Sequence, residues 1–329
     1  MVKIYSGLNW DGMGSLRLLW LTCLSGVALC ADYIDFHPAA SGPWFTGPLL
    51  TASAFTIPNG HYNIQPYLYA NNNFGLFNRH WHTVRFPEAA SNINLECYLQ
   101  MGITPFMDFT IAPSFFYNYV GDEESSWRFG DLYTEVSFQL AQQKGDKGFT
   151  AKFAIGELFP TGVYQHLNPN KLGTDSSGGG TFATTFQFIF SRRWNTYTFH
   201  YLAARMSMAC TLSPQLAVHG LNSYGGDRTT RGRVFPGTLF PLLFGFEYNM
   251  TQNWVLALDV ANALRLKTKF RGETIFPVGW DWAYSLSFAP AIEYNYSAEV
   301  GLIAGVWFSA LGKNSFNFLN YVVSLNWYI

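Results

Sequence analysis

Acidic side chains recur at alternate positions of segments whose pattern is that of β-strands, so several carboxylates would share one face. If those strands enclose a lumen, a ring of acids raises the local concentration of cations and sets ion selectivity. We therefore treat these acids and their basic or titratable counterparts as candidate selectivity residues. They are Glu96, Asp108, Asp131, Glu135, Lys152, His200, Glu247, Asp259, Glu293 and Glu299. The alternative is that they are solvated or paired, and that assembly needs only polarity on that face.

Other arrangements that could do chemistry are weak. His80 and His82 place two imidazoles on one side of an extended segment, but a metal site needs further ligands and none is identifiable nearby. His200 has no convincing Ser partner, so nucleophilic catalysis lacks a base within reach of a nucleophile. The Gly-rich stretch 175–180 lacks the Lys-Ser/Thr pair of a phosphate-binding loop. We expect no enzyme, no cofactor and no metal.

The C-terminal residues show most clearly the element that would position such side chains. Apolar side chains occupy alternate positions at Leu319, Tyr321, Val323, Leu325, Trp327 and Ile329. The residues between them, Asn320, Val322, Ser324, Asn326 and Tyr328, are mostly polar. A period of two predicts a strand with one apolar face. An apolar side toward lipid and a polar side toward a lumen are typical of a transmembrane β-barrel.

The composition agrees with a barrel. Hydrophobic residues make up 49% of the chain, aromatic residues 18% and charged residues 12%, whereas an ordinary soluble domain carries about twice that share of charge. After the first thirty residues, no segment is apolar enough for a spanning helix. The formal net charge of −1 gives no reason to expect nucleic acid as a partner.

The N-terminus has the pattern of a secretory leader. The apolar run Leu18–Ala31 follows Arg17 and is shorter than a membrane-spanning helix, which predicts a signal peptide over residues 1–31. Residues 32–59 are rich in proline and lack clean alternation, so we expect a periplasmic lead-in or a partial plug there. Residues 60–329 are expected to form the outer-membrane β-barrel.

The cysteines give little information about the fold or the function. Of the four cysteines, Cys23 and Cys30 lie in the predicted leader. A disulfide between Cys97, in a predicted strand, and Cys210, at a strand end, is one alternative. Two free cysteines in apolar surroundings are the favoured interpretation.

Period-two alternation predicts an all-β fold, a transmembrane antiparallel barrel of about twelve strands. The segments are 60–70, 92–103, 105–119, 129–142, 148–160, 180–192, 195–208, 238–250, 253–266, 281–295, 297–309 and 317–329. An even number of strands lets an antiparallel barrel close without an edge. The connections alternate between short periplasmic turns and long outer loops, as barrels require. The long loops are predicted at 71–91, 120–128, 161–179, 209–237, 267–280 and 310–316.

Aromatic residues and prolines test this assignment. Amphipathic rings near the periplasmic strand ends would lie at the lipid headgroups; these are Trp194, Tyr248, Trp254, Tyr294 and Trp327. Three prolines fit poorly, because proline removes a ladder hydrogen bond inside a strand; these are Pro66, Pro113 and Pro290. They indicate either bulges or a local error in the predicted register.

Short motifs add a resemblance. Pro160-Thr161-Gly162 follows a predicted strand, and Tyr164, Asn168 and Leu172-Gly173-Thr174 lead to a Gly-rich stretch and a new strand. Together with Gly42-Pro-Trp-Phe-Thr-Gly-Pro-Leu-Leu-Thr51, this pattern resembles the outer-membrane family named for the MetA pathway of phenol degradation. The resemblance covers about residues 40–329 and implies a barrel of transporter or channel type, without catalytic residues. Ile329 departs from the usual barrel-assembly signal, which ends in Phe or Trp.

Two functions follow as hypotheses for the outer membrane of a Gram-negative bacterium. The first is passive passage of a small solute, not identified by the sequence, through a narrow lumen. The second is a closed barrel whose outer loops bind a host or envelope partner; its basis is the length of the loops and their aromatic side chains. Expected partners are outer-membrane lipid and, through the C-terminal strand, the barrel-assembly machinery.

Overall fold

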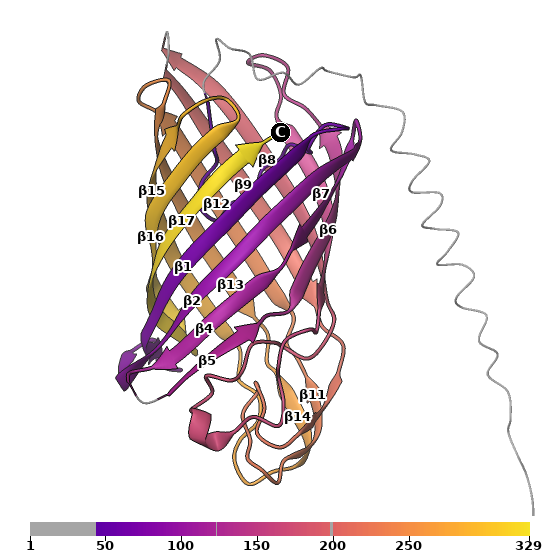
Figure 1. Ribbon diagram of the computed structural model, residues 1–329, viewed down its shortest axis with the longest axis vertical. Coiled ribbons are helices and arrows are strands. Elements are labelled where there is room, and N and C mark those ends of the chain that lie inside the picture. The colour runs from indigo at the N-terminus through magenta and orange to yellow at the C-terminus, as the bar shows by residue number, and fades with distance from the viewer. Residues whose placement is uncertain (1–43, 123, 198–199) are drawn as a thin grey trace, which may run out of the picture. The chain divides into compact units, whose positions relative to one another are not determined.

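Alternation of polar and apolar residues produces an antiparallel sheet that closes on itself (Figure 1). The computed structural model describes residues 44–122, 124–197 and 200–329; the predicted leader lies outside them. The segments of the barrel wall are β1 (Tyr62–Phe77), β2 (Thr83–Thr104), β3 (Met107–Ala112), β4 (Ser114–Val120), β5 (Glu124–Phe129), β6 (Leu132–Ala141), β7 (Thr150–Phe159), β8 (Ala183–Tyr197), β9 (His200–Leu212), β12 (Leu239–Asn249), β13 (Trp254–Arg265), β15 (Ala283–Asn295), β16 (Val300–Lys313) and β17 (Ser315–Tyr328).

The wall contains twelve strands, which confirms the predicted fold class. β3 and β4 form one strand interrupted at Pro113, because β2 pairs with both. β5 and β6 likewise form one strand interrupted after Phe129. β1 pairs with β17 on one side and with β2 on the other, so the described sheet has no open edge there. Closure satisfies the backbone groups that lipid cannot.

The three prolines mark gaps in the ladders and not errors of register. Pro113 separates β3 from β4. Pro66 pairs with β2 but is skipped in the pairing of β1 with β17, and Pro290 is skipped in the pairing of β15 with β16. In both cases the register continues unchanged beyond the gap. The missing N–H of proline is thus accommodated by omitting local pairs.

Half of the predicted long loops are wrong. The connections after β7, β9 and β13 are long, as predicted. However, most residues of 71–91, 120–128 and 310–316 belong to strands. At the long-loop end, the strands β1, β2, β4, β5, β16 and β17 are longer than the alternation indicated. The turn between β16 and β17 is Asn314 alone, with φ 49°, a conformation that asparagine tolerates. In the polar extension around Asn71 and Asn73, both faces carry polar residues, which hid the period of two.

The outward face of the wall is apolar. Leu256, Leu258, Leu302, Val323 and Leu325 are exposed on it, which is a surface suited to lipid. The five aromatic residues predicted as a girdle, from Trp194 to Trp327, are also exposed and lie near the short-turn end. Within the described part of the chain, no helix is long or apolar enough to span a membrane.

A small second sheet lies beyond the barrel at the long-loop end, opposite the end that carries the C-terminus (Figure 1). Its strands are β10 (Leu216–His219), β11 (Arg231–Phe235) and β14 (Lys269–Glu273), in the order β10-β11-β14. One face packs Leu216, Val218 and Val234 against Tyr224. The short 3-10 helix η1 (Pro169–Lys171) lies in the loop between β7 and β8.

Leu258 provides a test of the lipid-facing wall. We expect Leu258→Arg to lower the free energy of unfolding by about 2–4 kcal/mol, because the charge would lie in the apolar band. Urea unfolding in lipid vesicles measures this. The control is Ile275→Arg at a 76% exposed loop position, where we expect a change within about 0.5 kcal/mol. Equal effects at the two positions would contradict the assignment of the outward face.

Candidate functional site

Charged side chains lie on the inward face of the barrel. The alternation that places apolar side chains on the outward face places the residues between them on the inward face. Asp259 lies between the outward Leu258 and Val260, and none of its surface is exposed. Asp108, Lys152, Glu247 and Glu293 are buried on the inward side of their own strands. Buried charges require partners, so their contacts show how the lumen is organised.

Glu247 is paired with a cation. The Arg205 Nε atom lies 2.9 Å from Glu247 Oε2. Arg205 comes from β9, where it lies on the same inward face as the buried Ala203 and Ser207. Arg205 is absent from the predicted site residues, although its position between two small inward residues was a usable signal.

Residues 44–58, the lumen segment, lie against the inward face of the barrel wall. The backbone N–H of Thr46 donates to Glu293 Oε2 at 2.9 Å. Leu50 N and Thr51 N donate to the two carboxylate oxygens of Asp259 at 3.1 and 3.0 Å, and Thr51 Oγ1 donates to Asp259 Oδ1 at 2.6 Å. These inward acids therefore act as acceptors for backbone N–H groups of the segment.

The second half of the lumen segment is held by strands further round the wall. Ile57 N donates to Asp108 Oδ2 at 2.8 Å, and Thr56 N donates to Gln139 Oε1 at 3.0 Å. Gln139 Nε2 donates in return to the carbonyl of Ala54 at 2.9 Å. Asp108 and Gln139 lie near the short-turn ends of β3 and β6.

The lumen segment starts at that same end of the barrel. The carbonyl of Trp44 accepts from Asn249 Nδ2 and Asn295 Nδ2, each at 3.3 Å. These asparagines are the last residues of β12 and β15. Asp259, which holds Thr51, lies roughly midway along β13. The segment thus enters at the short-turn end, reaches the middle of the barrel and returns.

An apolar cluster fixes the deepest part of the segment. Leu49 is 2% exposed and packs with Tyr67, Ala289, Ile303 and Val322 of the wall. Burying a leucine side chain contributes about 1.5–3 kcal/mol. The inward face is therefore not uniformly polar, since it includes an apolar patch opposite Leu49.

Glycines in the wall allow the segment to approach. A Cβ atom on Gly245 would lie 2.6 Å from Pro48 Cγ and 3.0 Å from Thr51 Cβ. A Cβ atom on Gly102 would collide with the Pro58 carbonyl, and one on Gly301 with Thr46 Oγ1. Three strands thus lack a side chain where the segment passes, which indicates a built contact.

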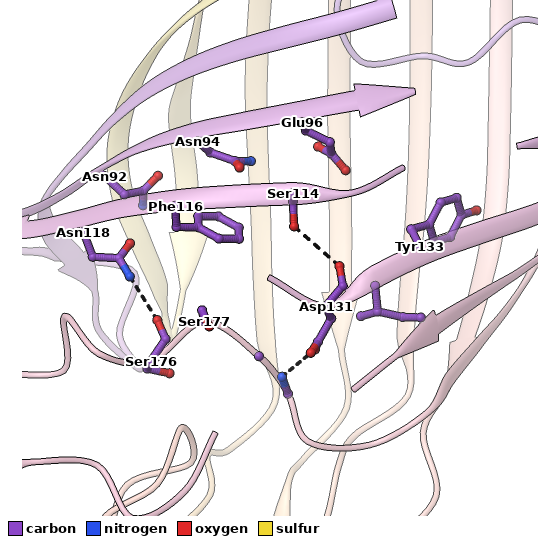
Figure 2. Close-up of a pocket in the computed structure, with 13 residues that line it drawn as sticks. Asn92, Asn94, Glu96, Ser114, Phe116, Asn118, Asp131, Tyr133, Ser176 and Ser177 are labelled. Atoms are coloured by element: carbon purple, nitrogen blue, oxygen red, sulfur yellow. Dashed lines mark hydrogen bonds between the residues drawn. The ribbon is translucent and has the colours of Figure 1, made fainter. Parts of the chain in front are cut away.

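A polar cavity of about 510 Å³ lies towards the long-loop end (Figure 2). Its lining includes Glu96, Phe116 and Tyr133, with an asparagine ladder of Asn92, Asn94 and Asn118, and no Lys, Arg or His. The Oδ1 atom of Asn94 is buried without a hydrogen-bond partner. The cavity therefore offers amide side chains and a carboxylate to a solute, with no basic side chain in its lining.

The loop between β7 and β8 forms one wall of this cavity. The Asp131 carboxylate accepts from Gly179 N at 2.7 Å (Figure 2). It also accepts from Gly162 N at 2.8 Å. Asn118 Nδ2 donates to the carbonyls of Thr174 and Ser176 at 2.9 and 3.0 Å. Both carboxylate oxygens of Asp131 thus bind the loop, and Glu96 is the other acidic residue that lines the cavity.

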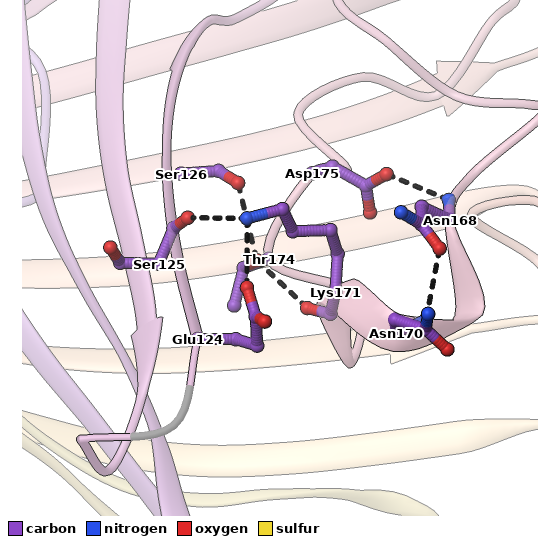
Figure 3. A network of polar contacts seen from close by, with 8 residues as sticks. All are labelled: Glu124, Ser125, Ser126, Asn168, Asn170, Lys171, Thr174 and Asp175. Carbon is purple, nitrogen blue, oxygen red and sulfur yellow. Dashed lines mark hydrogen bonds and ion pairs between the residues drawn. The ribbon is translucent and has the colours of Figure 1, made fainter.

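A second set of contacts joins the same loop to the β4–β5 hairpin (Figure 3). Lys171 Nζ lies 2.8 Å from Glu124 Oε2, and Thr174 Oγ1 donates to the Lys171 carbonyl at 2.8 Å. Asn168 N donates to Asp175 Oδ2 at 2.8 Å. The partly exposed ion pair contributes little by itself, but the network fixes the loop in one conformation.

The structure locates all ten candidate selectivity residues. Eight lie on the inward side or at the cavity: Glu96, Asp108, Asp131, Glu135, Lys152, Glu247, Asp259 and Glu293. Two lie elsewhere. His200 begins β9 on the outward face, where its ring stacks with the exposed Tyr248 at 5.9 Å. Glu299 is exposed in the turn before β16. The predicted strands 195–208 and 297–309 begin before β9 and β16 do in the structure, so both residues were predicted to lie inside a strand and to point inward.

The remaining sequence predictions concern cysteine and metal ligands. Cys97 and Cys210 are free thiols. His80 accepts from Arg79 Nε at 2.9 Å in the β1–β2 turn. In the described ranges, no group of three His, Cys, Asp or Glu side chains is arranged to hold a metal ion.

Outside the wall, hydrogen bonds hold the outer loops together. Asp227 accepts from Thr229 Oγ1, and from the N–H groups of Thr229, Ile275 and Phe276, at 2.5–3.0 Å. These bonds, led by the Thr229 hydroxyl, hold the pKa of Asp227 well below its usual range. Burial raises the pKa of Tyr224 to about 12; its hydroxyl donates to the Gly179 carbonyl at 2.7 Å.

Comparisons with known proteins identify the fold. No protein-family model matches the chain, and no curated protein matches its sequence. The COG4313 outer membrane channel from Pseudomonas putida F1 is similar, with a TM-score of 0.67 and 11% identity over 85% of this chain and 100% of that one. The Pseudomonas putida toluene transporter TodX gives a TM-score of 0.42 and 11% identity over 87% and 95%. At this identity, the first likeness shows an outer-membrane β-barrel fold and nothing finer.

Gly245 allows the contact with the lumen segment to be tested. We expect Gly245→Val to displace the segment while the barrel still folds, because valine suits a strand but its Cβ atom overlaps Pro48. The reporter is maleimide labelling of Ala54→Cys, a position that is 1% exposed, with Cys97 and Cys210 replaced by Ala. Labelling should accelerate at least about tenfold. Leu242→Val on the outward side of the same strand should leave the rate unchanged.

Proposed function

We propose that this protein is a passive channel for small solutes in the outer membrane of a Gram-negative bacterium. The observation that carries the proposal is a closed barrel with an apolar outward face and a polar cavity of about 510 Å³ on its inward side. The fold shared with an outer-membrane channel supports it. Closed strands are one of the two structures that can span lipid.

The lumen segment makes this a channel with a closed resting state. Leu49 packs against the wall, and residues 44–58 are hydrogen-bonded to β15, β13 and β3. In this proposal the segment closes the half of the lumen nearest the short turns, and a solute passes only when the segment moves. The bonds to Asp259 and Glu293 would set how often that happens. The predicted plug role of residues 32–59 thus becomes a proposal for residues 44–58.

The outer cavity is the proposed entry site. Glu96 and the asparagine ladder would attract cations and polar solutes from the outer side, since no basic side chain lines the cavity. Among the candidate acids, those nearest the short turns would instead hold the lumen segment. The acids would therefore divide into a selectivity group and a closing group.

Two finer assignments belong with this proposal. Membership of the family named for the MetA pathway of phenol degradation rests on the Pro160-Thr161-Gly162 motif and the lead-in sequence. Recognition by the barrel-assembly machinery would use β17, whose exposed Leu325 and Trp327 precede Ile329.

The second candidate function is a closed surface barrel. The packing of the lumen segment against the inward face is the observation that favours it, since Leu49 is buried among residues of the wall. Such a protein would act through its outer loops, and its barrel would conduct under no condition. Conductance therefore separates the two candidates.

Asp259 gives the direct test of the closing role. Asp259→Asn replaces an acceptor oxygen with an NH₂ group beside the N–H groups of Leu50 or Thr51, which destabilises the closed segment by about 1–2 kcal/mol. In planar bilayers, residues 32–329 carrying this change should open about tenfold more often than the wild type. Glu135→Gln is the control, because Glu135 contacts Tyr133 and Ser137 and not the lumen segment. Absence of openings from folded wild-type and Asp259→Asn protein would favour the closed surface barrel.

Glu96 gives the test of selectivity. We expect Glu96→Gln to lower the ratio of cation to anion permeability about twofold, because the cavity loses the one lining carboxylate that does not hold the β7–β8 loop. Reversal potentials under a salt gradient measure this ratio. Glu157→Gln is the control, since Glu157 pairs with Thr184 and alternates with the inward Lys152, Ala154 and Gly156. An unchanged reversal potential in both variants would remove Glu96 from the selectivity group.

A further inference from the structure

One face of the small outer sheet is strongly basic. Arg231 and Arg233 alternate along β11 with the buried Val234, and Lys269 and Arg271 alternate along β14 with Phe270. Arg233 pairs directly with Arg271 in the ladder. These four exposed cations, the basic face, therefore occupy adjacent positions on one side of two strands.

Acidic side chains do not neutralise the basic face. Between the described residues, the ion pairs join Arg205 to Glu247 and Lys171 to Glu124, and neither includes a member of the basic face. Glu273, opposite Arg231 in the ladder, is the acid on this side. Like charges directly opposite each other on a sheet are destabilising, so the juxtaposition of Arg233 and Arg271 is unexplained by stability.

The sheet that carries these cations is held firmly. Its other face buries Val218 and Val234 completely. Asp227 accepts from the N–H groups of Ile275 and Phe276, just beyond β14. The Arg271 guanidinium lies over the Phe235 ring, 5.2 Å from its centre. Cations with fixed positions bind an anionic partner with a smaller loss of conformational entropy.

The basic face lies close above the lipid-facing wall. β11 leads into β12 and β13 leads into β14 (Figure 1). The exposed Phe240, Leu264 and Leu266 lie on these strands or just after them. Because a strand rises about 3.3 Å per residue, Arg271 can lie at most about 23 Å beyond Leu264. Three residues separate β11 from β12, and three separate β13 from β14, so the basic face lies next to the outer ends of these two wall strands.

We propose that the basic face binds the phosphate groups of an acylated, phosphorylated glycolipid in the outer leaflet beside the barrel. Arginine donates to phosphate oxygens in pairs, and a basic cluster next to a membrane surface attracts anionic lipid at about 1 kcal/mol per cation. The apolar wall beneath would contact the acyl chains of the same molecule. A soluble polyanion would not use that wall, which is why the lipid is the favoured occupant.

The test measures binding of lipopolysaccharide to folded protein in detergent, with enzymatically dephosphorylated lipopolysaccharide as the matched ligand. Wild-type protein should bind the phosphorylated form more tightly, and the preference should weaken as salt rises. Arg233→Gln combined with Arg271→Gln should weaken binding about thirtyfold, because two cations are removed. Lys147→Gln combined with Arg192→Gln removes two exposed cations at the short-turn end and should leave binding unchanged.

Each other result would overturn the proposal. Equal affinity for the two glycolipids would show that phosphate is not recognised. Binding of heparin that is lost in the Arg233→Gln, Arg271→Gln variant, with no binding of lipopolysaccharide, would identify a soluble polyanion instead. Conductance of the double variant should equal that of the wild type, so loss of glycolipid binding and failure of the channel proposal remain distinguishable. Resistance of the folded band to unfolding in gels confirms that both double variants form the barrel.

Discussion

Hydrocarbon offers no partner for a backbone N–H or C=O group, and this constraint organises the molecule. A chain that crosses lipid with strands must pair every strand on both sides, which β1 achieves by joining β17 to β2. Closure then separates two environments. Every second side chain contacts lipid, and its neighbours have only each other, water or the lumen segment as partners. The buried Asp108, Asp259 and Glu293 are consequences of that separation, since each accepts hydrogen bonds from the segment.

The sequence predicted the wall well because lipid enforces the alternation there. Strands such as β13 and β17 show it cleanly, and all twelve strands were identified. The sequence predicted the strands poorly outside the membrane, where no lipid contacts one of their faces. Beyond the membrane both faces of a strand contact water, so the outer parts of β1 and β2 around Asn71 show no period of two, and the sequence predicts a loop there. His200 and Glu299 were misplaced for a related reason, because a shift of one residue at a strand end reverses the face.

Much of the candidate site was beyond the reach of sequence patterns. The seven acids and one lysine on the inward side followed from alternation, but their partners did not. Nothing in residues 44–58 indicates which strands they contact, since hydrogen bonds from Thr46 and Thr51 join positions some two hundred residues away. Gly245 was visible in the sequence, yet a glycine in a strand has several explanations. Only the approach of Pro48 gives its reason. The division of the acids into a closing group and a selectivity group therefore required the three-dimensional arrangement.

The path of residues 44–58 has a topological consequence. Trp44 and Ile57 are both held at the rim formed by the short turns, while Thr51 reaches the middle. The segment therefore enters and leaves the barrel through the same opening, and it does not pass through to the opposite end. Such a loop can be withdrawn and reinserted without unpairing any strand, because the ladder between β1 and β17 that closes the wall includes no residue of the segment. Assembly of the wall and filling of its interior are thus separable events.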